Sequence, residues 1–77
     1  MHITIAKVSE VFFDGEAEVL TVPSTGGELT ILGEHMPLIT TLKAGNIVVR
    51  QKGEQDKTFP ITSGVLEVRP EGVTVIL

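Results

Sequence analysis

Residues 27–45 read GELTILGEHMPLITTLKAG, and this stretch carries most of the information on the fold. Apolar and polar side chains alternate over residues 28–31, as they do in a half-buried β-strand. A turn that contains His35 follows, and then an apolar segment, residues 37–42, in which we expect the only helical turn of the chain. Residues 43–45 predict a second turn. The stretch therefore indicates short elements that follow one another closely.

The same alternation recurs along the rest of the chain. Valine, isoleucine and threonine are abundant, and these β-branched side chains fit a pleated strand better than a helix. The alternating segments are 2–5, 20–22, 28–31, 47–50, 58–61, 65–69 and 73–77. We expect Pro23 to end the second segment and Pro60 to place the fifth at a sheet edge. Two sheets that close on one another would bury the apolar faces, so the sequence predicts an all-β fold of about eight short strands.

The composition limits the size and class of the protein. A length of 77 residues leaves room for a single domain over residues 1–77, and a hydrophobic share of 42% argues for a folded core. The chain has no cysteine, which excludes disulfides and thiolate metal sites. A net charge of −4 and a pI of about 5.0 disfavour nucleic acid and anionic membrane surfaces as partners. No signal peptide or long apolar helix is found, so we expect contact with a membrane only through protein partners.

The side chains that catalysis usually requires are scarce. The chain has no cysteine, tyrosine or tryptophan, and its two histidines, His2 and His35, lie far apart in sequence. Glu34 and His35 are adjacent, as an acid/base pair would require, but no nucleophile lies nearby in sequence. We therefore interpret His35 as a contact residue and His2 as an exposed residue at the start of a strand. No catalytic residue and no cofactor are predicted.

Three other patterns were candidates for binding. Gly26 and Gly27 lack the lysine and the following helix of a phosphate-binding loop, so they predict a turn between strands. Four carboxylates match no calcium-loop spacing, and we expect a solvated rim and no metal site. They are Asp14, Glu16, Glu18 and Glu28. In the aromatic pair Phe12 and Phe13 we expect one ring in the core, and partner contact by the other is an alternative that the sequence leaves open.

Several short motifs occur in the order and with the spacing of one known family. They are Ser9 after the first strand, Phe-Asp-Gly at 13–15, Gly-Glu-Leu at 27–29, His-Met-Pro-Leu-Ile-Thr at 35–40, Lys-Ala-Gly at 43–45, Gly-Val-Leu-Glu-Val at 64–68 and Gly-Val-Thr-Val at 72–75. Each motif is weak alone, but together they cover nearly the whole chain. By these motifs the chain resembles the N-terminal domain of the epsilon subunit of F-type ATP synthases.

The resemblance implies a fold, a function and contact residues. It implies a flattened antiparallel β-sandwich of about eight to ten short strands. It also implies a non-catalytic central-stalk subunit of a proton-translocating synthase, which bridges the gamma subunit and the c ring and couples proton transport to ATP synthesis. The location implied is peripheral, on the cytoplasmic face of the bacterial inner membrane or the stromal side in plastids. Ser9, His35 and Thr40 match positions that face the gamma subunit, and Glu28 and Leu29 match the loop that faces the c ring.

The chain departs from the family pattern in two places. The family usually has Pro-Gly before the histidine, and Gly33 and Glu34 stand there instead. The family also normally continues into a C-terminal helical hairpin, which can inhibit ATP hydrolysis and in some members binds ATP. These properties cannot be carried over to residues 1–77. One face of the sandwich would lack its helical cover, so we expect either polar residues on that face or self-association through it.

Two other functions are compatible with the same sequence. Lipoyl- and biotinyl-carrier domains are also acidic, all-β and of similar size, and they carry a modified lysine at the tip of a tight hairpin. Lys43 before Ala44 is the nearest match, although Leu42 stands where these domains have an acidic residue or methionine. A regulatory homologue that acts outside the synthase, for example by sequestering the gamma subunit, is the other.

Overall fold

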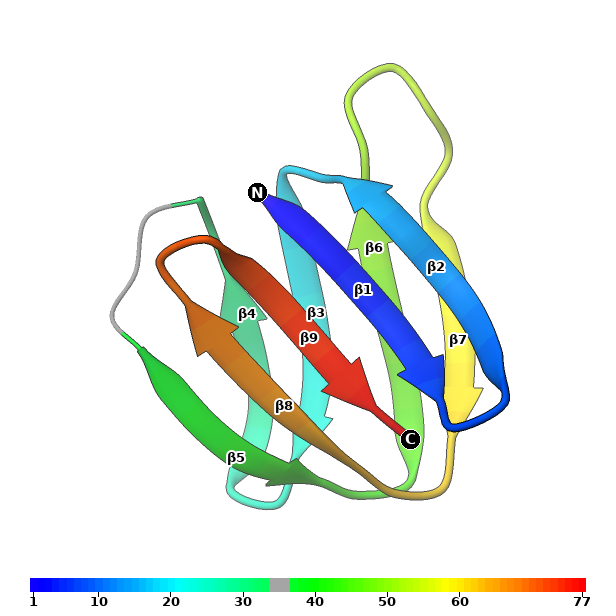
Figure 1. Ribbon diagram of the computed structural model, residues 1–77, viewed down its shortest axis with the longest axis vertical. Coiled ribbons are helices and arrows are strands. Elements are labelled where there is room, and N and C mark those ends of the chain that lie inside the picture. Colours follow the sequence, from blue (N-terminus) through cyan, green and yellow to red (C-terminus); the bar gives the residue numbers. More distant parts are fainter. Residues whose placement is uncertain (34–36) are drawn as a thin grey trace.

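The computed structural model describes residues 1–33 and 37–77, and this part of the chain forms nine strands (Figure 1). They are β1 (His2–Lys7), β2 (Glu10–Glu16), β3 (Val19–Ser24), β4 (Gly27–Ile31), β5 (Leu38–Leu42), β6 (Gly45–Arg50), β7 (Lys57–Ile61), β8 (Gly64–Arg69) and β9 (Gly72–Ile76). The described residues form no helix, and hence none that is long and apolar enough to cross a membrane. The prediction of an all-β fold is confirmed.

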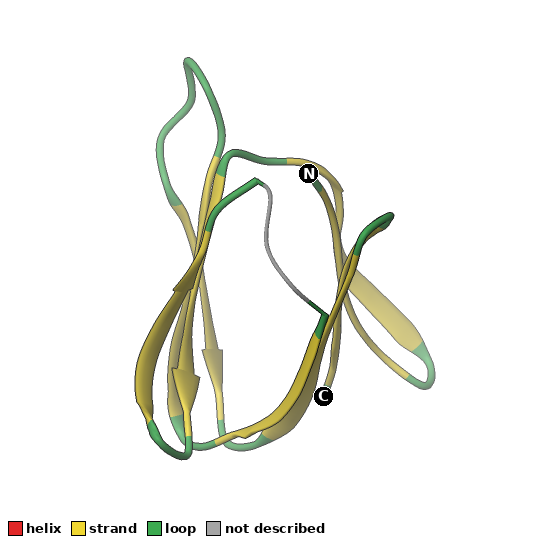
Figure 2. Cartoon of the chain, turned by 90° about the vertical axis from the view of Figure 1, so that its left-hand side faces the viewer, coloured by secondary structure: helices red, strands yellow, loops and turns green. Residues whose placement is uncertain are grey.

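The nine strands form one hydrogen-bonded sheet that curls into two facing layers (Figure 2). One layer has the order β2-β1-β9-β8-β5, and the other has the order β4-β3-β6-β7. The layers join where Leu42 of β5 pairs with Ser24 of β3. The sandwich is therefore present as predicted, but it is not wholly antiparallel, because β1 and β9 run parallel to one another.

The core lies between the layers because alternate side chains of the strands point inward. β1 buries Ile3 and Ile5, and the neighbouring strand β9 buries Val73 and Val75. The other buried apolar residues are Ala17, Leu20, Val22, Ile31, Leu42, Ile47, Val49, Ile61, Leu66 and Val68. The hydroxyl of Ser24 is also buried, and it donates a hydrogen bond to the carbonyl oxygen of Gly27 at 2.5 Å. Each predicted alternating segment thus contributes its expected face to the core.

The end strands β2 and β7 meet at the open side of the sandwich. The rings of Phe13 and Phe59 pack there edge to face, with centroids 6.2 Å apart and an interplanar angle of 64°. Such a pair stabilises by about 0.5–1.5 kcal/mol beyond the area it buries. β7 is hydrogen-bonded to β6 alone, which confirms the edge position predicted from Pro60. Proline lacks a backbone donor and so protects this edge from further strand pairing.

Three local predictions need correction. Residues 37–42 contain no helical turn: Leu38–Leu42 is strand β5, and it pairs antiparallel with β8. Glu10–Glu16 is a further strand, β2, which was missed because this edge strand buries none of its side chains fully and shows no apolar face. Pro23 does not end its strand, since β3 runs to Ser24. In each case the pairing partner, and not the local pattern, determines the conformation.

The alternation of burial along β8 gives a direct test of the core. Leu66 is fully buried, whereas 41% of its neighbour Val65 is exposed on the outer face. Leu66→Ala removes buried methyl groups and leaves a cavity, so we expect it to lower the free energy of unfolding by about 2–5 kcal/mol. Val65→Ala is the control and should cost less than about 1 kcal/mol. Urea denaturation measures both, and equal losses would show that β8 is not oriented as described.

Candidate functional site

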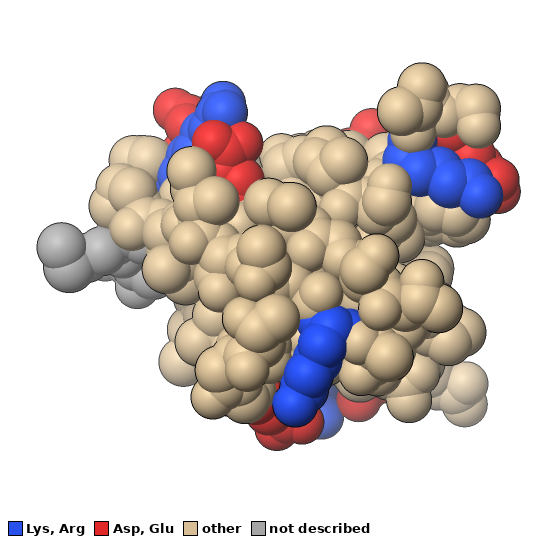
Figure 3. Space-filling model, turned by 90° about the horizontal axis from the view of Figure 1, so that it is seen from below, with Lys and Arg blue, Asp and Glu red and all other residues tan. Residues whose placement is uncertain are grey.

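Four short turns gather at one end of the sandwich, which we call the lower end. They are residues 8–9, 25–26, 43–44 and 62–63, which follow the odd-numbered strands β1, β3, β5 and β7 (Figure 1). Seen from this side, the surface is mostly uncharged, with the charged side chains in a few separate groups (Figure 3). The lower end therefore carries few charged side chains, and the ends of the eight strands that these turns connect hold it in place.

The two residues predicted to face the c ring lie beside this end. Glu28 and Leu29 occupy the start of β4, directly after the turn at residues 25–26. Gly27 opens the strand with a φ of 123°, a conformation that glycine adopts without strain. The side chain of Glu28 is exposed, but Leu29 is half-buried and packs against the core. Only Glu28 therefore presents its side chain freely to a partner.

The residues predicted to face the gamma subunit do not form one cluster. Ser9 is exposed in the turn between β1 and β2, whereas Thr40 is half-buried in the middle of β5. These strands lie at opposite sides of the same layer, three to four inter-strand spacings or about 14–19 Å apart. His35 lies outside the described residues. A single partner that contacts both Ser9 and Thr40 must therefore span the width of this layer, for example over its outer face.

An apolar row crosses that outer face. It consists of Val11, Ala6, Ile76 and Val65, which are consecutive cross-strand neighbours on β2, β1, β9 and β8. Thr41 of β5 continues the row beside Val65. Val11, Ile76 and Val65 are 62%, 50% and 41% exposed. We call Val11, Ala6, Ile76 and Val65 the outer row, and adjoining apolar side chains that are exposed in this way make it a candidate contact surface.

The outer row was not singled out from the sequence, although its signal was present. Val65 and Ile76 occupy the positions that alternate with buried residues, where a solvent-facing strand normally carries polar side chains. The expectation that the face without helical cover is either polar or self-associating stays a prediction.

A groove of about 350 Å³ opens at the lower end between β2 and β7. Phe12, Pro60, Ile61 and Leu77 form its apolar walls. Lys7, Thr62 and Ser63 supply its polar groups. Phe12 is exposed here, whereas Phe13 packs against the core. This agrees with the prediction that one ring of the pair is in the core.

His2 joins three charged groups at the opposite end of the sandwich. Its Nε2 lies 2.5 Å from Oδ1 of Asp14, and its Nδ1 lies 3.0 Å from Oε2 of Glu16. The amino group of Met1 lies 3.7 Å from Oε1 of Glu16. Hydrogen bonds from Glu16 first and Asp14 second raise the pKa of His2 above its ordinary value of 6.5. The cluster ties the start of β1 to the end of β2, and no group of three ligands that could hold a metal occurs in the described part of the chain.

A family comparison identifies the chain. The family described as "ATP synthase, Delta/Epsilon chain, beta-sandwich domain" matches residues 1–77. The chain belongs to this family. It is 39% identical over 77 residues to the ATP synthase epsilon chain of Herminiimonas arsenicoxydans, and 38% identical over 77 residues to that of a Janthinobacterium species. In both cases 99% of the chain is covered but only 55% of the relative, so the chain spans about half the length of these relatives.

Solved structures show the same fold. A chain of the Euglena gracilis mitochondrial ATP synthase, in a structure of OSCP, F1 and c-ring, superposes with a TM-score of 0.87 at 21% identity, over 96% of this chain and 48% of that one. A chain from the central stalk and c-ring structure of the Tetrahymena thermophila synthase gives a TM-score of 0.85 at 16% identity, over 99% and 61%. At these identities the likeness concerns the fold.

The histidine cluster gives a stability that depends on pH. Because the folded-state pKa of His2 is raised, protonation of His2 stabilises the folded chain, and this gain is lost as pH rises above about 6.5. We expect His2→Gln to lower the melting temperature relative to wild type at about pH 6 and to have little effect at about pH 8.5. Asp14 and Glu16 face His2 directly, and the Met1 amino group pairs with Glu16. Thermal melts at both pH values measure the difference in melting temperature between wild type and His2→Gln. A difference that is the same at both pH values would contradict the prediction.

Proposed function

We propose that this chain is a non-catalytic rotor subunit of a proton-translocating F-type ATP synthase, with residues 1–77 as its β-sandwich domain. In this role it bridges the gamma subunit and the c ring and couples proton transport to ATP synthesis. It would sit peripherally at the membrane, on the cytoplasmic face in a bacterium. The observation that carries the proposal is the family match over residues 1–77, together with curated relatives that are ATP synthase epsilon chains.

The lower end is suited to the polar loops that the c ring presents. Its short turns expose hydroxyl and backbone groups, and Glu28 offers a carboxylate beside them. A polar rim with satisfied hydrogen bonds gives an interface specificity and register. We therefore assign the c-ring contact to the lower end and to Glu28, with Leu29 supporting β4 from the core side.

The outer row is suited to the gamma subunit. A partner that extends from Ser9 to the edge of β5 over the outer face would cover the apolar side chains of the outer row. The side chain of Thr40 alternates inward, but β5 pairs with β8 alone over residues 38–40, so a partner can reach Thr40 around this free edge. His35 is part of the same proposal on the basis of its motif. Desolvated apolar residues at an interface centre typically dominate its binding energy.

The carrier-domain alternative fits this geometry poorly. A carrier lysine stands at the tip of a tight hairpin, but Lys43 joins two strands that belong to different layers. The backbone N–H of Lys43 is also fixed, since it donates to the carbonyl oxygen of Pro23 at 2.9 Å. Lys43 is therefore not at a protruding tip. The regulatory homologue differs from the rotor subunit in its partners, and binding experiments separate the two.

Reconstitution tests the proposed function. Tagged protein should retain a gamma–c-ring subcomplex prepared without its epsilon subunit, and should restore proton-driven ATP synthesis in vesicles that contain an epsilon-depleted synthase. Binding of gamma without the c ring, and no restored synthesis, would favour the regulatory homologue. A folded sample that binds neither would overturn the proposal.

The outer row gives a sharper test of the gamma contact. Val65→Ser removes apolar contact area, and we expect it to weaken binding to isolated gamma subunit by about tenfold, or about 1.4 kcal/mol. Val48→Ser is the matched control, because Val48 lies on the outer face of the opposite layer, where it pairs with Thr21 and Thr58. Calorimetric titration measures both variants, and equal affinities would place the gamma contact elsewhere. Sedimentation of the chain alone at increasing concentration shows whether a second copy covers the row instead.

A further inference from the structure

The groove between β2 and β7 contains a lysine that is held in place without an anionic partner. The ammonium group of Lys7 lies 5.6 Å from the centroid of the Phe12 ring, a cation–π distance. None of the ion pairs between described residues includes Lys7. Most other cations behave differently, since Arg50, Lys57 and Arg69 all pair with carboxylates. Lys7 is thus a positioned charge that is free to accept a partner.

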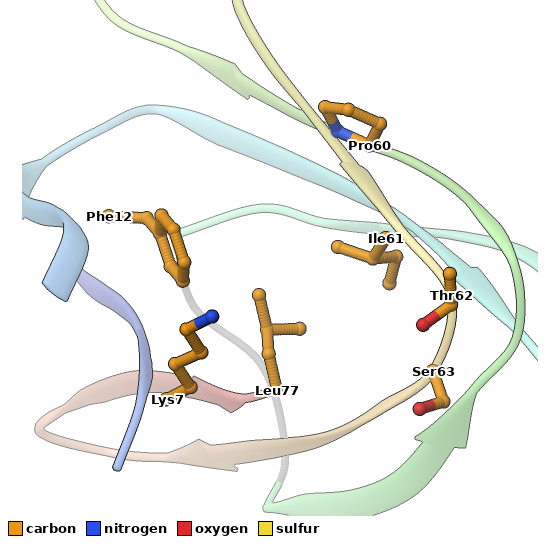
Figure 4. Close-up of a pocket in the computed structure, with 7 residues that line it drawn as sticks. All are labelled: Lys7, Phe12, Pro60, Ile61, Thr62, Ser63 and Leu77. Atoms are coloured by element: carbon orange, nitrogen blue, oxygen red, sulfur yellow. The ribbon is translucent and has the colours of Figure 1, made fainter. Parts of the chain in front are cut away.

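Hydroxyl groups stand on the other side of the same groove. Thr62 and Ser63 lie in the turn between β7 and β8, and their oxygens point toward the space in front of Leu77 and the Lys7 ammonium (Figure 4). No hydrogen bond of either hydroxyl is recorded within the described chain. An ammonium and two hydroxyls therefore offer donors that converge from opposite walls. The floor and rim between them are apolar, formed by Ile61, Pro60 and Leu77.

This arrangement selects for a carboxylate on an apolar stem. One ammonium balances one negative charge, and the hydroxyls can donate to the second oxygen. A phosphate group carries more charge and more oxygens, and it is usually bound by several cations or by backbone N–H groups at a helix N-terminus, neither of which lines this groove. The protein is acidic, with a net charge of −4, so a partner carboxylate is attracted only where an unpaired lysine such as Lys7 stands.

We propose that this groove is the docking site for an acidic side chain, a glutamate or aspartate flanked by apolar residues, that a partner protein of the proposed rotor presents to the lower end. This inference rests on the proposed function, because the carboxylate is supplied by a partner subunit of the proposed rotor. The open groove has a volume of about 350 Å³, which is small for a ligand pocket. It has room for the acidic side chain of the partner and the apolar residues that flank it. It adds a charge-specific contact to a lower end that carries few charged side chains.

Two arms test the inference. In the first, affinity for the gamma–c-ring subcomplex is measured for wild type, Lys7→Gln and Lys52→Gln. Lys52 is the matched control, since it is an exposed lysine in the loop of residues 51–56 at the opposite end. We expect Lys7→Gln to weaken binding about tenfold, with a loss that shrinks as salt is added, and Lys52→Gln to have no effect.

In the second arm, labelled chain is titrated with the peptide acetyl-Leu-Glu-Leu-amide and followed by NMR. The signals of Lys7, Thr62 and Ser63 should shift, with an affinity on the order of millimolar. The glutamine version of the peptide should shift them much less, and so should inorganic phosphate. Equal shifts with both peptides, or stronger shifts with phosphate, would overturn the carboxylate site.

The two arms separate this inference from the proposed function. Wild type that binds the subcomplex as tightly as Lys7→Gln, with no preference for the glutamate peptide, would refute the groove and leave the rotor subunit standing. Wild type that fails to bind the subcomplex would refute the rotor proposal, and the peptide arm would still decide whether the groove binds carboxylates.

Discussion

The parallel pairing of β1 with β9 is the constraint on which the rest of the fold depends. It joins residues that are almost a full chain length apart, and it aligns Ile3 with Val73 and Ile5 with Val75 in the centre of the core. A carbon atom added at Gly72 would lie 2.9 Å from the carbonyl oxygen of His2, so the close approach of the two strands requires glycine there. Because such a pairing closes a long loop, it forms at a large entropic cost and only with the support of the whole core.

This pairing determines which residues of the layer face the core and which face outward. Once β1 lies beside β9, the hairpins β1–β2 and β8–β9 and the pairing of β8 with β5 complete one layer, and alternate residues are committed to opposite faces. The residues that fill the core and those that form the outer row are then neighbours in sequence, as Val65 and Leu66 show. The outer row and the core are thus built from the same strands, so the core beneath positions the side chains of the outer row.

The sequence predicted the fold better than the site. Strands with a clear apolar parity, such as residues 47–50 and 73–77, were predicted correctly because their alternation reflects burial on one face. β2 and β5 were not, since an edge strand without fully buried side chains and a strand that begins with two exposed apolar residues show no parity. The contact residues depend on which strands become neighbours. No local pattern shows that Val11 and Val65 share one row, or that Lys7 faces Ser63 across a groove.

The two ends of the sandwich differ in a way that suits a mechanical joint. At the lower end each turn between paired or joined strands is two residues long, so little chain can yield under load. The opposite, upper end carries the longer loop of residues 51–56. Exposed ion pairs hold this loop, such as Arg50 with Asp56 and Lys57 with Glu54. Exposed ion pairs of this kind stabilise by less than about 1 kcal/mol each. In the proposed rotor, the lower end and the outer row are the surfaces suited to transmit force, because the β-sheet itself positions their side chains.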